Sequence, residues 1–486
     1  MTQKKFIGNL GLLIILNLLI KPFWILGIDR TVQNTVGSES YGLFFALFNF
    51  SFLLNIFLDA GITGFNNRHI ARNPEDLPNM FGKIVVLKLI MAILYTIFTL
   101  GAGMLVGYGP AQMEMLYFLC FNQFLLSFIL YFRSNIAGLH LFKTDSLLSV
   151  LDRLLMIVIC AVLLWGNITH SPFKIEWFIY SQTAAYGITA IVGFVLNLYQ
   201  TDRINLVWDG QFVKNLLKNS LPFASLVLLM SFYSRIDSVM LERLLPNGDK
   251  QAGIYALGFR ILDAANMLAY LFAVLLLPIF SRLLKTQTTD QMIEVKKLCG
   301  LSFKLIMTLA IPISVGSCYY QKEIMSSLYV EEFANSAQVF GILMSCFIAV
   351  SITYIYGTLL TANGNLKALN YMAITGILLN MGMNFILIPK YEATGAAFAS
   401  LLTQFATAFL QIGIVQYYFR FKVSYLSGIM FFCFLLSVLI GGYVLKNSGL
   451  TWDIGLFVFI IYSFAIAWIT RMVNVAPFVD ALYRKE

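Results

Sequence analysis

The chain has 486 residues, of which 59% are hydrophobic and only 12% are charged, and its mean hydropathy is +0.79. This composition excludes an ordinary soluble domain and indicates a protein that resides among membrane lipids. The net charge of +9 does not indicate nucleic-acid binding, because Lys and Arg stand in short connections between apolar runs. No nucleic-acid partner is therefore expected.

Long apolar stretches follow one another along the whole chain. Since a helix needs about 20 apolar residues to cross a hydrocarbon core, they predict an all-α polytopic membrane protein with about 14 transmembrane helices. The predicted helices span residues 8–28, 41–64, 80–108, 114–140, 146–167, 174–198, 220–245, 252–283, 297–318, 336–360, 366–388, 394–418, 424–446 and 452–474. Turn residues mark the connections, as in GYGPAQ at 107–112 and IPKYEATG at 388–395.

The distribution of basic residues predicts the orientation. Of the 33 Lys and Arg residues, 18 fall in segments on the side of the two termini, 6 on the opposite side and 9 within helices. Cytoplasmic connections carry the excess of positive charge, so both termini are expected in the cytoplasm.

A polar stretch at 199–219 divides the chain. Phe212, Leu216 and Leu217 share one helical face and Lys214 and Lys218 the opposite one, a pattern that predicts an amphipathic helix on the cytoplasmic membrane surface. The predicted organisation is an N-terminal lobe of helices 1–6 (1–198), this linker (199–219), a C-terminal lobe of helices 7–12 (220–418), and helices 13–14 with the tail (419–486).

The two predicted lobes share short similar segments. YGLFFALFNF (41–50) resembles AGIYALGFRI (252–261), which pairs Gly42 with Gly253. Six helices separate the two segments, and an even number returns the chain to the same side, so a parallel pseudo-repeat with a substrate cavity between two six-helix lobes is predicted. Chance similarity between apolar helices is the alternative.

Three basic residues lie at similar depth inside predicted spans: Lys21, Arg235 and Arg260. Charges in a bilayer are costly and normally face protein or a water-filled cavity, so these residues predict a cationic zone that suits an anionic substrate. The alternative is structural neutralisation. Asp263 shares a helix face with Arg260, and Asp237 follows Arg235 by two residues.

Asp59 lies near the inner end of the second predicted helix. Its carboxylate is expected to pair with Arg68 or a loop amide; as the alternative, Asp59 and Asp263 are candidates for a gate or lobe contact. Lys88 and Arg153 lie closer to cytoplasmic ends and are expected to anchor their helices at the membrane interface.

Polar side chains of helices 11 and 12 form the remaining candidate site. Asn380 and Asn384 share a helix face, and Ser400 lies on the next helix. Together with Asp237 they supply oxygen ligands for a small hard cation such as sodium. Hydrogen bonding between helices explains the same residues. No cofactor is expected, and coupling to sodium or protons stays open.

Three segments resemble a known family. GIYALGFRILDAANMLAYLFAVLLLPIFSRLLK (253–285) and NGNLKALNYMAITGILLNMGMNFILIPKYEATGAAFASLLTQ (363–404) are similar to the helix 8 and helix 11–12 signatures of polysaccharide-type flippases. GSESYGLFFALFNFSFLLNIFLDAGI (37–62) fits as well. These flippases, which transport O-antigen and other oligosaccharide repeat units, belong to the multidrug/oligosaccharidyl-lipid/polysaccharide exporter (MOP) superfamily.

The resemblance implies a non-enzymatic transporter in the bacterial cytoplasmic (inner) membrane. It would carry an undecaprenyl-pyrophosphate-linked oligosaccharide from the inner to the outer leaflet by alternating access, together with a polysaccharide polymerase and a chain-length regulator. By this resemblance Lys21 and Arg260 match residues that engage pyrophosphate, and we place Arg235 with them. Asn384 stands where related lipid II flippases carry a carboxylate, which weakens the sodium site.

Two other functions compete with this one. A multidrug/cation antiporter of the same superfamily is the nearer, although basic residues at mid-depth disfavour a cationic cargo. A membrane glycan polymerase or ligase is the third. Such enzymes usually need large outer loops, whereas the longest outer segment here, 319–337, is short.

Overall fold

The computed structural model describes residues 16–17, 19–166, 171–201, 206–285, 288–421 and 425–473. The start of the first predicted helix (8–15) and the end of the predicted tail (474–486) lie outside the described residues. The chain forms two compact units, Met1–Gly253 and Ile254–Glu486. In both units the described elements are helices, as the apolar runs predict.

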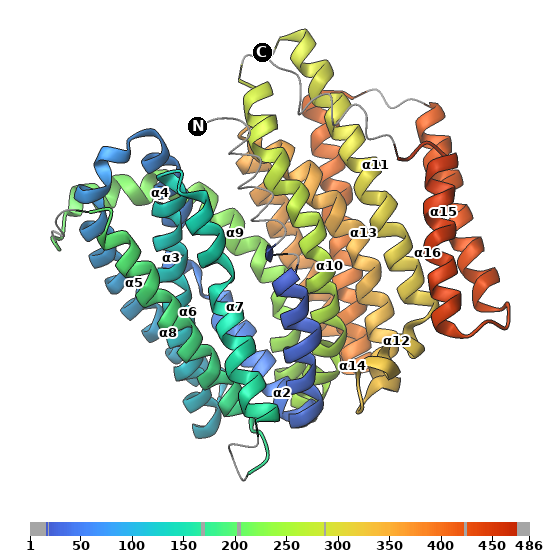
Figure 1. The fold of residues 1–486 in the computed structure, drawn as a ribbon, viewed down its shortest axis with the longest axis horizontal. Coiled ribbons are helices and arrows are strands. Elements are labelled where there is room, and N and C mark those ends of the chain that lie inside the picture. Colours follow the sequence, from blue (N-terminus) through green and yellow to red (C-terminus); the bar gives the residue numbers. More distant parts are fainter. Residues whose placement is uncertain are drawn as a thin grey trace. The chain divides into compact units, whose positions relative to one another are not determined.

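Unit 1 is built from helices that run side by side (Figure 1). Its elements are η1 (Trp24–Asp29), α2 (Arg30–Leu53), α3 (Ile56–Asp59), α4 (Ile62–Arg72), η2 (Pro74–Asp76), α5 (Leu77–Val106), α6 (Pro110–Gly138), α7 (Phe142–Trp165), α8 (Ile175–Leu198), α9 (Gly210–Leu244) and the first residues of α10 (Gly248–Leu283).

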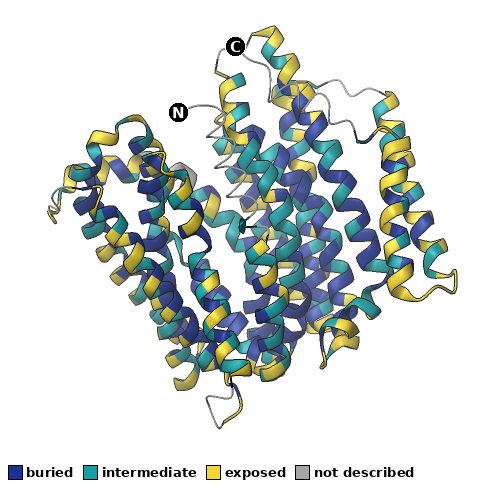
Figure 2. Cartoon of the chain, in the orientation of Figure 1, coloured by how far each residue is buried: buried dark blue, intermediate teal, exposed yellow. Residues whose placement is uncertain are grey.

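Unit 2 contains the rest of α10 and the helices that follow it. These are α11 (Thr289–Tyr319), α12 (Gln321–Leu328), α13 (Phe333–Ala362), α14 (Leu366–Phe419), α15 (Tyr425–Lys446) and α16 (Trp452–Ile469). Helix α13 packs between α11 and α14, while α15 and α16 pack on each other and on α11. Most residues of α15 and α16 are exposed or half-buried (Figure 2), as expected of helices at the lipid-facing edge of a unit.

The predicted polytopic architecture is confirmed. Among the described residues, 11 helices are long and apolar enough to cross a membrane, or 12 with the bent pair Leu19–Leu53 and Ile56–Arg72. Two of these spans contain a non-helical residue, Gly37 in α2 and Glu392 in α14. The 54 residues of α14 would measure about 80 Å in one straight helix, far beyond the thickness of a bilayer. Dividing Leu19–Leu53 at Gly37 and α14 at Glu392 raises the number of spans among the described residues from 12 to about 14.

The predicted linker helix differs from the observed structure. Its amphipathic segment forms the first turns of α9, which continues without a break from Gly210 to Leu244. Val213 and Leu216 are buried in a cluster of apolar side chains from α4, α5 and α6, whereas Lys214 and Lys218 are exposed. The predicted apolar and polar faces are therefore correct, but the apolar face packs on protein.

Helix α9 thus belongs to unit 1, although the sequence placed it first in the C-terminal lobe. The lobe boundaries at 198 and 220 describe the predicted repeat and not these compact units, so they stay predictions.

Two glycines allow α2 and the start of α10 to touch backbone to backbone. A Cβ atom on Gly42 would lie 1.9 Å from the carbonyl oxygen of Asp249, and one on Gly253 would lie 1.9 Å from the carbonyl oxygen of Ser38. No real side chain fits at such distances. Gly42 and Gly253 are the two residues that the predicted repeat pairs with each other.

Candidate functional site

The span that includes α2 is broken at an elbow of unit 1. The helix axis turns by 45° between Leu19–Leu53 and Ile56–Arg72. At the turn, Ala60 and Gly61 adopt left-handed conformations with φ of 43° and 76°. A Cβ atom on Gly61 would come within 2.7 Å of the carbonyl oxygen of Ser220, so the start of the membrane-spanning part of α9 rests directly on the elbow. The sequence DAGITG supplies the glycine that this geometry requires.

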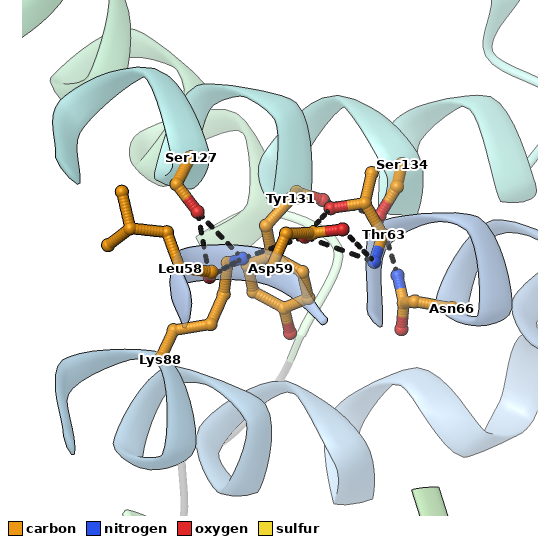
Figure 3. Close-up of polar contacts among 8 residues, drawn as sticks. All are labelled: Leu58, Asp59, Thr63, Asn66, Lys88, Ser127, Tyr131 and Ser134. Carbon is orange, nitrogen blue, oxygen red and sulfur yellow. Dashed lines mark hydrogen bonds and ion pairs between the residues drawn. The ribbon is translucent and has the colours of Figure 1, made fainter. Parts of the chain in front are cut away.

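A buried lysine holds the elbow in place (Figure 3). The ammonium group of Lys88 on α5 donates hydrogen bonds to the carbonyl oxygen of Leu58 at 3.0 Å, to Oδ1 of Asp59 at 3.0 Å and to Oγ of Ser127 at 2.8 Å. The side chain of Lys88 is 0% exposed, whereas that of Asp59 is 32% exposed. Lys88 therefore satisfies a carbonyl oxygen at the break and at the same time neutralises the carboxylate beside it.

Asp59 in turn stabilises the start of α4. Its carboxylate accepts hydrogen bonds from the backbone N–H of Thr63 at 3.3 Å and from the hydroxyl of Thr63. The expected loop amide is thus present, but the basic partner is Lys88, while Arg68 donates to the carbonyl oxygen of Gly64 at 3.2 Å. The expectation that Lys88 anchors α5 at the interface is wrong, because its side chain is completely buried. The role of Asp59 as a gate stays a prediction.

Buried amides continue the polar contacts beyond the elbow. The side-chain amide of Asn66 on α4 donates to Ser134 Oγ at 2.8 Å and to Asn135 Oδ1 at 2.6 Å, both on α6. Asn135 then donates to Asn197 Oδ1 on α8 at 2.9 Å. Because such bonds are costly to break in an apolar interior, they join α4, α6 and α8 into one body.

Arg235 lies on the face of α9 that packs on α2. Its Nη1 donates to Asn49 Oδ1 at 3.2 Å, and its guanidinium lies 5.0 Å from the ring centre of Phe52. Asn49 also donates to Ser238 Oγ at 2.9 Å, which fixes the amide. Arg235 is half-buried and Asp237 is 1% exposed, so both predicted residues lie inside the helix bundle as expected of charges in a span.

A carboxylate that sequence reasoning missed lies a few residues after Lys21. Asp29 is 1% exposed at the end of the π-helical turn η1. The hydroxyl of Tyr41 lies 2.9 Å and 3.0 Å from its two oxygens, and Gln33 donates to it at 3.3 Å. The first predicted helix ends at residue 28, so the sequence did not mark Asp29 as a charge inside a span. A π-helical turn in a span is a feature found often at functional positions.

The remaining predicted residues belong to unit 2. Arg260 and Asp263 are both half-buried on α10. Asn384 donates to Asn380 Oδ1 at 3.1 Å, and Ser400 Oγ lies 3.2 Å from the hydroxyl of Tyr255. Interhelical and intrahelical hydrogen bonds therefore account for part of this polar set.

The sodium site as a whole stays a prediction, since Asp237 belongs to unit 1 and the other three residues to unit 2. Across the described ranges, no cluster of three or more His, Cys, Asp or Glu residues is arranged to hold a metal ion.

Comparison with known proteins places the chain in a family. Residues 9–284 match the family described as "Polysaccharide biosynthesis protein". The match covers more than half of the 486 residues, so the chain belongs to that family. Two uncharacterized membrane proteins are each 24% identical to it. YabM of Bacillus subtilis aligns over 78% of this chain and 74% of its own, and a protein of Methanocaldococcus jannaschii over 76% and 88%.

Solved structures show the same fold. The lipid II flippase MurJ in an inward closed conformation matches with a TM-score of 0.70 at 15% identity, over 94% of this chain and 97% of that one. A MATE family multidrug resistance transporter in an inward-facing conformation matches with a TM-score of 0.62 at 14% identity, over 84% and 98%. A MOP superfamily transporter from Pyrococcus furiosus matches with a TM-score of 0.62 at 15% identity, over 86% of this chain and 96% of that one.

The protein is therefore a polytopic membrane protein with the MOP transporter fold. The resemblance to polysaccharide-type flippases that the sequence motifs indicate is confirmed by the family match and by this fold.

Proposed function

We propose that the protein is a flippase that moves an undecaprenyl-pyrophosphate-linked oligosaccharide from the inner to the outer leaflet of the bacterial cytoplasmic membrane. The polysaccharide family match supports the glycan, and the MurJ-like fold supports alternating access for a lipid-linked cargo. Both termini lie in the cytoplasm in this proposal, in agreement with the distribution of Lys and Arg.

One observation carries the proposal: basic side chains lie half-buried inside apolar spans. Lys21, Arg235 and Arg260 are neither fully exposed nor sealed in the core. In a site of low dielectric constant, ammonium and guanidinium groups bind phosphate oxygens through charge-assisted hydrogen bonds that are stronger than in water. Such groups suit a pyrophosphate headgroup, while the lipid tail remains in the bilayer.

The partners in this proposal are the lipid-linked oligosaccharide, the surrounding lipids, a polysaccharide polymerase and a chain-length regulator. The protein acts as a transporter without a catalytic site. Movement of sodium or protons remains a means of driving the cycle.

The test is complementation of cells that lack the gene. We expect Arg260→Ala to abolish surface glycan at an unchanged amount of membrane-inserted protein, because a phosphate ligand is lost. Arg282→Ala is the matched control, since Arg282 is an exposed arginine near the end of the same helix, and it should restore normal glycan. Normal export by Arg260→Ala would remove the assigned role of that residue.

The multidrug/cation antiporter is the second candidate, because MATE transporters share the fold. Half-buried basic residues disfavour cationic drugs, which they repel in a poorly screened site. Drug susceptibility separates the two proposals. A deletion strain with normal susceptibility and lost surface glycan supports the flippase, and the reverse pattern supports the antiporter.

A further inference from the structure

Lys21 and Arg153 come from helices that are adjacent in unit 1. Nδ2 of Asn17 donates to Oγ of Ser149 on α7 at 3.2 Å. Lys21 follows Asn17 by four residues, and Arg153 follows Ser149 by four, which is about one helical turn in each case. Farther along, the guanidinium of Arg153 lies 5.7 Å from the ring centre of Trp24. The register from Asn17 to Trp24 therefore places Lys21 at the level of Arg153.

Aromatic rings hold the guanidinium of Arg153 in position. It lies over both Trp24 and Tyr186, the latter at 5.9 Å from the ring centre. Its Nε is 3.7 Å from Oδ2 of Asp152, which is too long for a strong hydrogen bond. The side chain is 27% exposed. Arg153 is thus packed in a fixed direction by aromatic contacts, and not merely placed at the interface as an anchor.

The surroundings of Lys21 are positively charged. Its charged neighbours are the two arginines Arg153 and Arg133 and one carboxylate, that of Asp152. Arg133 is held by Asp145, whose Oδ1 lies 2.8 Å from its Nε. Within the part of the chain that the structure describes, Lys21 forms no hydrogen bond or ion pair.

Lys21, Arg133 and Arg153 bring three positive charges to this half-buried position, whereas Asp145 and Asp152 supply two negative charges. An anion that binds here would balance the remaining positive charge. We propose that Lys21 and Arg153 form a phosphate-binding site within unit 1, between the first helix and α7, with Arg133 adding positive charge. Its ligand is the phosphate of a lipid headgroup. This inference rests on the proposed function and extends it, because it adds a residue of α7 to the predicted ligands.

The two basic groups contact the phosphate in different ways. The ammonium of Lys21 supplies a point charge with three donors, and the planar guanidinium of Arg153 supplies paired donors that match two phosphate oxygens. Lys21 gains a phosphate in a position where two arginines and one carboxylate, Asp152, surround it, and Trp24 and Tyr186 hold the guanidinium of Arg153 in place.

The experiment measures binding to the full-length protein purified in detergent. The probes are undecaprenyl pyrophosphate, undecaprenol without phosphate, phosphatidylglycerol and inorganic pyrophosphate. We expect Lys21→Met and Arg153→Gln each to weaken binding of undecaprenyl pyrophosphate about ten-fold or more. Arg153→Lys should lose less than Arg153→Gln because it keeps the charge. Arg72→Gln, which changes an exposed arginine, should leave binding unchanged.

Each of the following results would contradict a part of the inference. Equal affinity of the original protein and Arg153→Gln would overturn the site, as would equal affinity for undecaprenol. Tighter binding of phosphatidylglycerol would assign the site to ordinary phospholipid and overturn the cargo. If the variants lose pyrophosphate binding but still export glycan, the site stands and the proposed function fails. If export needs Arg260 while Arg153→Gln binds normally, only this site fails.

Discussion

The side chain of Lys88 is 0% exposed, and its ammonium group donates three hydrogen bonds. Removing one member of a buried ion pair is more harmful than removing both, because the remaining charge loses its compensation. The two members differ here, since the carboxylate of Asp59 is one-third exposed and can be hydrated. The cost of breaking the pair should therefore depend on which residue is changed.

We expect Asp59→Asn to lower the free energy of unfolding by about 3 kcal/mol, because it leaves the ammonium of Lys88 buried with neutral partners. Lys88→Met should cost about 1–2 kcal/mol, since water reaches the carboxylate that remains. The double variant should lose less than the sum of the two. Reversible unfolding of the purified protein in detergent measures all three, and strictly additive losses would show that the pair is not coupled.

At the scale of single residues, the sequence shows that a charged side chain lies within a span more readily than it shows which group pairs with that side chain. Lys21, Arg235 and Arg260 could be selected by depth alone, and the structure places all three half-buried. The role of Lys88 could not be found in this way, because its partners lie on α3 and α6, far away in the sequence. Its position deep in a helix of 30 residues was the available signal.

At the scale of secondary-structure elements, glycine residues determine how closely two helices can approach each other. Gly42 lies where an added Cβ would overlap the backbone of Asp249, whereas a Cβ on Gly101 of α5 would meet nothing within 4 Å. We expect Gly42→Ala to lower the free energy of unfolding by about 1–3 kcal/mol, because α2 and α10 must move apart. Gly101→Ala should raise it by up to about 1 kcal/mol, since alanine favours the helix. The same unfolding measurement compares them, and equal effects would contradict the close contact.

The start of α9 is attached to α5 through one ion pair. Nζ of Lys83 donates to Oδ2 of Asp209 at 2.8 Å, and this bond lowers the pKa of the Asp209 carboxyl below its ordinary value of 3.8. A lowered pKa in the folded state means that the stabilisation is present above pH 3.8 and is lost as the pH falls through the folded-state pKa.

At neutral pH we expect Asp209→Asn to increase hydrogen exchange in the first turns of α9, while the original protein shows that increase only in acid below pH 3.8. Asp76→Asn is a suitable control, because Asp76 pairs with His69 on α4. Unchanged exchange in Asp209→Asn would mean that the apolar contacts of Val213 and Leu216 hold these turns without the ion pair.

The local sequence predicts where a helix is interrupted, but it does not predict where a helix continues into the next span. The segment IPKYEATG predicts an interruption, and Glu392 within it has φ of 50° in α14. The amphipathic pattern before residue 220 could not show that its helix continues into the next span, because no residue at the junction requires a break or forbids one. Tertiary packing of Val213 and Leu216 decides the outcome.

The whole molecule combines a shared transporter fold with its own set of charges. The fold is common to MurJ and to MATE transporters, so it does not select the cargo by itself. Apolar length and charge distribution were enough to predict the polytopic class, and the family motifs to predict the superfamily. In our proposal, cargo selectivity depends on side chains from helices distant in the sequence, such as Lys21 and Arg153, whose proximity only the folded unit reveals.

The most direct test of the account is translocation in proteoliposomes that contain the purified protein and a fluorescent undecaprenyl-pyrophosphate oligosaccharide. The account predicts that the protein moves this lipid between leaflets, that Arg260→Ala is inactive and that Arg282→Ala is active. It also predicts no movement of an undecaprenyl glycoside that lacks phosphate. Equal movement of both lipids, or equal rates for the original protein and Arg260→Ala, would contradict the claim that basic residues in the spans serve a phosphate-bearing cargo.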